Sequence, residues 1–154
     1  MVTGETARRR GRAVGIDLGS RRIGIAVTDS AGTMALPRGT VTRSTDTEGD
    51  RRRLVQMIVD EEATVVVVGL PLSLDGSRGR AARSAEDEAQ ALRTLLEGHG
   101  IGVELFDERL TTVSAHQALA AGGASEKDRR QTVDRAAAAV MLGAWLDSRR
   151  DGSP

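Results

Sequence analysis

The sequence predicts an α/β domain built on one five-stranded mixed sheet flanked by helices. Two short apolar segments joined by a turn open the folded part of the chain, and an unbroken β-branched run follows at residues 64–68. Helix-forming segments occur only after the third expected strand. We therefore expect an antiparallel meander first, to which helical crossovers then add parallel strands. A chain of 154 residues is suited to a single domain with one core.

The first three strands are expected to form the meander. Arg12–Leu18 is a short apolar run fit for a buried strand, and residues 23–28 alternate large and small side chains as its hairpin partner. A weaker strand at residues 36–42 contains Pro37, which suits the edge of a sheet. Residues 43–50 are polar and are expected to connect this strand to the first helix.

Helices and strands alternate in the rest of the chain. Residues 51–62 carry apolar side chains at helical spacing, and the run at 64–68 is typical of strands covered on both faces. The further expected elements are a loop at 69–77, a long helix ending near Gly98, a strand at 101–106, a short helix at 111–121, and a last helix opened by a capping box at 125–128. We expect residues 1–11 to form a disordered Arg-rich arm, 12–147 the domain and 148–154 a flexible tail.

Composition excludes several classes of protein. The chain has no cysteine, which rules out disulfides, thiolate metal sites and cysteine nucleophiles, and its single Phe and single Trp are too few for a base-stacking platform. The formal net charge is zero, but the basic residues are nearly all Arg and occur in clusters. Such clusters can bind phosphate, although a solvated surface explains any one of them more simply. Because no apolar stretch approaches a membrane span or a signal peptide, we expect a cytoplasmic protein.

Three acids occur at positions that a packed domain would not ordinarily give them. Asp17 lies inside the first strand, although an Asx turn or a helix cap explains it equally well. Glu108 follows the fifth strand, and spacing alone does not exclude Asp107 in its place. Asp134 shares a helix face with apolar residues, too far into the helix for a large dipole effect. If the first and fifth strands are parallel, Asp17 and Glu108 emerge at the carboxyl edge, where open sheets bind ligands.

Divalent cations would account for these acids. A buried unpaired carboxylate is costly, and converging carboxylates repel one another. Cations remove both penalties, and hard oxygen ligands suit Mg²⁺ or Mn²⁺. Two such ions ~4 Å apart can activate a water and stabilise the leaving oxygen of a phosphodiester. The two histidines, His99 and His116, are better explained as a helix cap and an ordinary helix residue. The sequence thus predicts a site for two ions at Asp17, Glu108 and Asp134, with nucleic acid as substrate.

Four motifs in order resemble those of the YqgF family, whose members are described as pre-16S rRNA nucleases and as Holliday-junction-resolvase-like proteins. They are Gly15-Ile-Asp-Leu-Gly19, Val68-Gly-Leu-Pro-Leu72, Asp107-Glu-Arg-Leu-Thr-Thr112 and Val133-Asp-Arg-Ala-Ala137. The resemblance runs from about residue 12 to residue 146. It implies a ribonuclease H-like fold, a nuclease that matures the 5′ end of 16S rRNA in ribosome biogenesis, and active-site acids at Asp17, Glu108 and Asp134.

Five residues around these acids are candidate substrate contacts, and two of them, Gly19 and Arg109, also have an ordinary structural explanation. Gly19 and Arg21 lie in the first turn, where a tight turn alone explains the glycine. Ser77 and Arg78 lie in the loop that leaves the fourth strand at the same edge. Arg109 follows Glu108, and a salt bridge to a nearby acid explains it as well as a phosphate contact does.

Alternative functions remain open at the level of sequence. A resolvase acting on branched DNA is the first, and it favours a dimer, although monomer and homodimer cannot be distinguished. A non-catalytic rRNA-binding assembly module is the second. Actin-like ATPases and sugar kinases have a phosphate motif like Asp17-Leu-Gly-Ser20, but they need two such domains and a second Gly-rich loop, which this chain lacks. Precursor rRNA is favoured over branched DNA only through the family resemblance.

Overall fold

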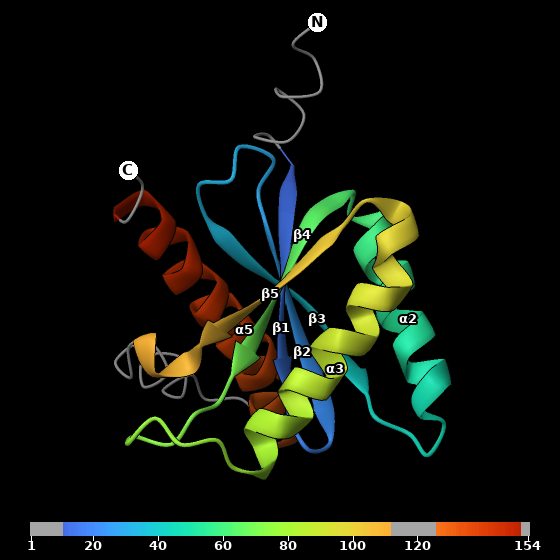
Figure 1. Ribbon diagram of the computed structural model, residues 1–154, viewed down its shortest axis with the longest axis vertical. Coiled ribbons are helices and arrows are strands. Elements are labelled where there is room, and N and C mark those ends of the chain that lie inside the picture. Colours follow the sequence, from blue (N-terminus) through green and yellow to red (C-terminus); the bar gives the residue numbers. More distant parts are fainter. Residues whose placement is uncertain (1–10, 112–125, 152–154) are drawn as a thin grey trace, which may run out of the picture.

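The computed structural model describes residues 11–111 and 126–151, with the side chains of 11–111 and 136–149. A five-stranded sheet in the order β3-β2-β1-β4-β5 lies between helices α2 and α3 on one face and helix α5 on the other (Figure 1). The strands are β1 (Arg12–Leu18), β2 (Arg22–Thr28), β3 (Ala35–Thr42), β4 (Ala63–Leu70) and β5 (Gly102–Asp107). The helices are α2 (Thr47–Asp60), α3 (Arg80–Leu96) and α5 (Glu126–Asp151), with 3₁₀ turns η1 (Glu97–His99) and η2 (Glu108–Leu110).

The predicted mixed sheet is confirmed. Strands β1, β2 and β3 pair antiparallel, whereas β1 pairs parallel with β4 and β4 pairs parallel with β5. The first and fifth strands are therefore parallel, as the prediction for the acids required. Strand β3, which contains Pro37, lies at the edge of the sheet, where a residue without an N–H is tolerated.

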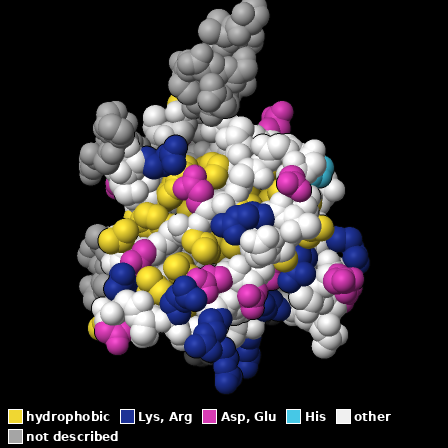
Figure 2. Space-filling model, in the orientation of Figure 1, with side chains coloured by type: hydrophobic (Ala, Val, Ile, Leu, Met, Phe, Trp, Pro, Cys, Tyr) yellow, Lys and Arg dark blue, Asp and Glu magenta, His cyan; other side chains and the backbone are white. Residues whose placement is uncertain are grey.

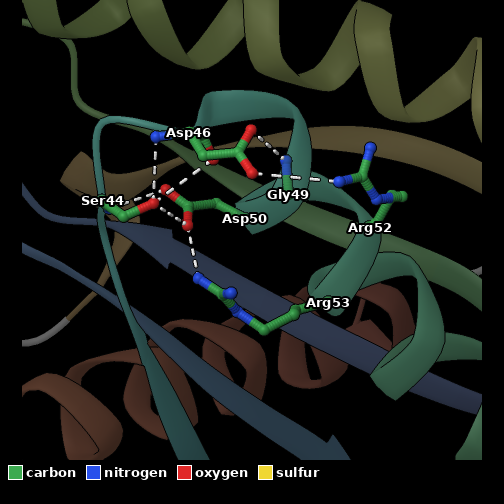
Figure 3. A network of polar contacts seen from close by, with 6 residues as sticks. All are labelled: Ser44, Asp46, Gly49, Asp50, Arg52 and Arg53. Carbon is green, nitrogen blue, oxygen red and sulfur yellow. Dashed lines mark hydrogen bonds and ion pairs between the residues drawn. The ribbon is translucent and has the colours of Figure 1, made fainter.

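Helix α2 begins at Thr47, within the segment expected to be a polar connector, because that segment caps the helix. The side chain of Asp46 accepts a hydrogen bond from the backbone N of Gly49 at 2.9 Å. Asp50 accepts hydrogen bonds from the backbone N and the Oγ of Ser44, both at 2.8 Å, and forms an ion pair with Arg53 (Figure 3). The polar residues thus satisfy the first turn of the helix, and periodicity, which counts only apolar residues, placed its start too late.

The core has two layers, one on each face of the sheet. The layer under α2 and α3 contains Val14, Ile16, Ile25, Leu54, Ile58, Val66, Val68, Leu92 and Leu96, among others. The layer under α5 contains Ala13, Ala26, Val67, Phe106, Ala138, Met141, Leu142, Trp145 and Leu146. Strand alternation places Asp17 on the α5 face with Ala13 and Gly15. Burial of Ala138, Met141 and Trp145 confirms that the helix face predicted to carry Asp134 packs on the sheet.

Several predictions fall at the margins of the described residues. The expected helix at 111–121, the opening Ser125 of the capping box, His116 and the arm at residues 1–10 lie outside them. Helix α5 continues through Asp151, so residues 148–151 are helical rather than part of a tail. In the described part of the chain, no helix has an apolar stretch long enough to cross a membrane.

Candidate active site

The three parallel strands β1, β4 and β5 end at one edge of the sheet, at the bottom and lower left of Figure 1. Asp17 is the next-to-last residue of β1, and Glu108 is the first residue after β5. Both side chains are half-buried. The fold therefore brings together two acids that lie far apart in the sequence, at the edge where sheets of this type bind ligands.

The side chains of Asp17 and Glu108 share a hydrogen bond. Burial, that hydrogen bond, and the negative charges of Asp17 and Asp107 raise the pKa of Glu108 from its ordinary value of 4.5 to about 8. Without a cation, a protonated Glu108 donates to the Asp17 carboxylate at neutral pH, because two ionised carboxylates in contact would repel. Two of the three acids predicted to converge, Asp17 and Glu108, are thus in contact, and a second negative charge at this site is unfavourable.

Asp107 has a different partner from Glu108, which resolves the geometric ambiguity between them. Its carboxylate forms an ion pair with Arg109 Nη2 at 2.6 Å and accepts the backbone N of Arg109 at 2.9 Å. The hydrogen bonds from Arg109 lower the pKa of Asp107. Glu108, and not Asp107, faces Asp17, and the salt bridge considered for Arg109 is the one present.

Helix α5 carries Asp134 toward this edge. The helix runs antiparallel to β1, so its N-terminal part lies near the carboxyl end of that strand (Figure 1). A Cβ atom built on Gly15 would lie 3.0 Å from Cβ of Leu142 and 3.4 Å from the carbonyl O of Ala138, which shows how closely the helix approaches β1. Asp134 is one turn before Ala138 on the same face. Its side chain lies outside the described residues.

The turn between β1 and β2 holds two predicted substrate contacts, Gly19 and Arg21. The backbone N of Gly19 donates to the carbonyl O of Arg22 at 3.0 Å, and a Cβ on Gly19 would lie 2.6 Å from that oxygen. The tight turn therefore suffices to explain this glycine. Arg43 braces the turn, since its Nε donates to the Gly19 carbonyl at 2.7 Å and its backbone N to the Arg21 carbonyl at 2.8 Å. Sequence analysis placed Arg43 in a polar connector and missed this role, for which no local pattern gives a signal.

The loop from Pro71 to Gly79 holds Ser77 and Arg78 beside the same edge. Ser77 is exposed, and its backbone N donates to Asp75 Oδ1 at 2.9 Å. Arg78 forms an ion pair with Glu86 at 3.4 Å, with 61% of its side chain exposed. Arg109 Nη1 donates to the carbonyl O of Leu74 at 3.4 Å. Arg109 thus links the loop to Asp107, which precedes Glu108.

Of the three arginines predicted to contact substrate, Arg21 has the fewest interactions with other described residues. It is exposed, and within the described ranges its side chain has no hydrogen bond or ion pair, whereas Arg78 and Arg109 each have an acidic partner. Basic side chains project from the lower end of the face in Figure 2, the end at which the parallel strands finish in Figure 1. Acidic side chains lie among them, so the positive charge is local.

The residues present fit a divalent cation. Asp17 and Glu108 supply hard oxygen donors in contact. The pKa of Glu108 is raised first by burial and then by the contact with Asp17, and both disfavour the charged form that a cation would stabilise. Among the described residues, no three His, Asp or Glu side chains group closely enough to hold a metal ion. A third protein ligand would therefore come from a side chain that the structure does not describe, and the side chain of Asp134 is one of these.

The fold defines the class of protein. Two solved structures of Thermus thermophilus RuvC, one in complex with a Holliday junction substrate, superpose with TM-scores of 0.54 and 0.56 at 17% and 18% identity, and each superposition covers 92% of this chain and 96% or 97% of the other. A yeast mitochondrial Holliday junction resolvase superposes over 89% of this chain and 78% of the other, with a TM-score of 0.53 and 10% identity. This chain has the ribonuclease H-like fold of these resolvases.

The family follows from sequence comparison. The model of the RuvX family, described as Holliday junction resolvase, matches residues 11–148, and the chain belongs to this nuclease family. A relative from Mycobacterium sp. (strain KMS) is 44% identical over 96% of this chain and 86% of its own length, and one from Rhodococcus opacus (strain B4) is 46% identical over 91% and 79%. Both carry the name "Putative pre-16S rRNA nuclease". The resemblance to the YqgF family is thereby confirmed.

Proposed function

We propose that this chain is a divalent-metal-dependent nuclease that cleaves precursor 16S rRNA at its 5′ end, with Asp17, Glu108 and Asp134 as the metal-binding acids. The observation that carries the proposal is the contact between Asp17 and Glu108 at the carboxyl edge of the parallel strands. Two acids in contact, with no basic partner among the described residues, do not stabilise the fold, whereas they can bind Mg²⁺ or Mn²⁺.

In the proposed reaction some residues bind the cations and others position the substrate. Asp17 and Glu108 would hold one or two cations, and Asp134 would approach them from helix α5. When bound, such ions supply a nucleophilic water and stabilise the leaving oxygen of a phosphodiester. Arg21, exposed on the β1–β2 turn, is placed to bind a substrate phosphate. The loop at residues 71–79, linked to Arg109, would border the bound strand.

Relatives at 41–46% identity support the choice of precursor 16S rRNA as substrate, because each is named for that activity. Their alignments cover 91–96% of this chain, including all three proposed acids. We therefore expect the purified protein to shorten a precursor 16S transcript at its 5′ end in the presence of Mg²⁺ or Mn²⁺.

The test uses the wild type, Asp17→Asn and a control, Asp60→Asn, which alters an exposed acid at the end of α2. Each is incubated with precursor 16S rRNA in Mn²⁺, in Mg²⁺ and in chelator. The proposal expects cleavage by wild type and control only with metal, and no cleavage by Asp17→Asn, whose RNA binding is retained because a repelling charge is removed. Binding without cleavage by the wild type in every condition would instead identify a non-catalytic RNA-binding module.

Resolution of branched DNA is the second candidate function. The description of the family model and the fold shared with a resolvase solved on a Holliday junction favour it. Symmetrical cleavage of two strands requires two active sites, and hence a dimer on the junction. Paired nicks in a four-way junction by the same protein preparations, with no cleavage of precursor rRNA, would select this function.

A further inference from the structure

Gly69 occupies the central position between the two acids. It lies in β4, which runs between β1 and β5 (Figure 1). Gly69 pairs with Phe106 of β5, and Val68 pairs with Ile16 of β1, so the next step along both strands sets Gly69 beside Asp17. Alternation directs its missing side chain to the α5 face, the face on which Asp17 lies.

The carboxyl group of Glu108 fills the volume that a side chain at residue 69 would need. A Cβ atom on Gly69 would lie 2.4 Å from Oε1 of Glu108 and 2.9 Å from its Cδ. Non-bonded atoms do not approach this closely in folded proteins, so any residue other than glycine must displace the carboxyl group. Because β5 and β1 are separated by one strand, roughly 10 Å, Glu108 must pass over β4 to reach Asp17.

We propose that Gly69 is a positioning residue for the metal-binding acids: its lack of a side chain opens the passage across β4 through which Glu108 reaches Asp17. The inference rests on the proposed function, in which these two carboxylates bind the cation. It also accounts for the residue type at 108, since the shorter side chain of Asp would not span the same strand.

Backbone conformation does not explain this glycine. The described glycines with positive φ are Gly32, Gly76 and Gly100, and Gly69 is not among them, so an L-residue can adopt its backbone angles. It ends a run of valines in a buried strand, where glycine weakens pairing and packing. A residue that costs folding stability and is not needed for a turn is explained by the space that it leaves.

Gly15 provides a contrast on the adjacent strand and the same face. A Cβ there would meet Cβ of Leu142 and the carbonyl O of Ala138, atoms of helix α5 that cannot move without the helix. At Gly69 the obstructing atoms are the end of a flexible side chain, which can swing away. Gly15→Ala should therefore lower the melting temperature, whereas Gly69→Ala should leave it near the wild-type value and weaken metal binding.

The experiment measures Mn²⁺ affinity by calorimetry, melting temperature in chelator, and cleavage of precursor rRNA, in the full-length chain. The variants are Gly69→Ala, Gly15→Ala and a control, Gly39→Ala in β3, where a Cβ would meet no atom within 4 Å. For Gly69→Ala we expect Mn²⁺ affinity and kcat to fall by about 10- to 100-fold, with KM and melting temperature little changed. Gly39→Ala should behave as wild type. Wild-type Mn²⁺ affinity in Gly69→Ala would overturn the proposal.

A double-mutant cycle with Glu108→Ala separates this inference from the proposed function. Once the carboxyl group is removed, Gly69→Ala should cause no further loss of Mn²⁺ affinity, because both changes act on the same contact. If Gly69→Ala is unexpectedly unstable, Glu108→Ala should restore its melting temperature, and failure to do so overturns the positioning role. If Glu108→Ala alone binds Mn²⁺ like wild type, the metal assignment in the proposed function fails, whatever Gly69 does.

Discussion

Asp50 and Glu108 are two acids withdrawn from solvent in surroundings of opposite kind. Asp50 accepts hydrogen bonds from the backbone and side chain of Ser44 and forms an ion pair with Arg53; the hydrogen bonds from Ser44 lower its pKa (Figure 3). Glu108 lies against Asp17, and among the described residues no Lys or Arg forms an ion pair with it. An acid surrounded by donors stabilises the fold, whereas an acid against another acid opposes it until a cation binds.

The largest expected effect of this difference is on catalysis. In Glu108→Gln we expect kcat for rRNA cleavage to fall by about 1,000-fold, because a metal ligand that supports several kcal/mol of transition-state stabilisation is lost. Its melting temperature in chelator at neutral pH should rise, because Gln, unlike Glu108, does not have to take up a proton when the chain folds. Asp50→Asn should do the reverse, with near wild-type kcat and a melting temperature about 5 °C lower, because its hydrogen bonds from Ser44 and its ion pair with Arg53 in the first turn of α2 are weakened.

Steady-state cleavage and thermal unfolding in chelator check both variants. The contrast between the two acids is contradicted if Glu108→Gln is less stable than the wild type. It is also contradicted if Asp50→Asn loses as much activity as Glu108→Gln. Either result would mean that the neighbouring groups of an acid do not determine whether it stabilises the fold or serves catalysis.

The pH dependence of stability gives the next effect. Between pH 4.5 and about 8 the unfolded chain has released the Glu108 proton while the folded chain retains it, so in chelator this group lowers the free energy of unfolding as pH rises. Asp50 acts in the opposite sense and in another range. Its lowered pKa stabilises the fold above its ordinary value of 3.8, and this stabilisation is lost as pH falls below it.

Urea unfolding of the chelated protein from pH 3 to pH 9 measures both contributions. Glu108→Gln should flatten the decline at neutral pH, and Asp50→Asn should flatten the loss in acid. Saturating Mn²⁺ should remove the neutral decline in the wild type and in Asp50→Asn, both of which keep Glu108. A decline at neutral pH that persists in Glu108→Gln would assign it to another group.

The sequence predicted the sheet and the pair of acids because both depend on local pattern plus topology. The valine run of β4 and the hairpin of β1 and β2 fixed which strands are parallel, and parallel strands bring Asp17 and Glu108 to one edge. What it could not resolve was the choice between Asp107 and Glu108, because the local turn at η2, held by Arg109, decides which acid faces the sheet.

Two other features depend on contacts with no sequence pattern. The role of Gly69 requires knowing that the side chain of Glu108, which follows the neighbouring strand β5, crosses it, although a glycine that ends a buried valine run was a visible signal. The early start of α2 depends on Ser44, Asp46 and Asp50 as a capping network, which apolar periodicity does not detect. The chemistry of Asp134 rests on its family position and stays a prediction.

A smaller effect is expected at Asp107, the acid with a basic partner at the site itself. Asp107→Asn removes the ion pair with Arg109 and loosens the loop that Arg109 contacts, but it leaves Asp17 and Glu108 in place. We expect Mn²⁺ affinity to be unchanged and kcat/KM to fall by roughly 5-fold, in keeping with a modest, solvent-exposed ion pair. Calorimetry and cleavage assays test this. A loss of Mn²⁺ affinity as large as that of Glu108→Gln would make Asp107 a metal ligand.

The smallest expected effect concerns substrate phosphate rather than metal. Arg21 is exposed at the turn beside Asp17, so Arg21→Ala should weaken RNA binding about 3-fold and reduce the slope of log Kd against log salt by about 0.7, the loss of one phosphate contact to a single strand. Mn²⁺ affinity should not change. The control is Arg38→Ala, since Arg38 is held by Glu61 at 2.5 Å, away from the carboxyl edge. If both variants and the wild type show equal salt slopes, Arg21 binds no phosphate, although it has no acidic partner among the described residues. In that case only the acids identify this edge as a functional site.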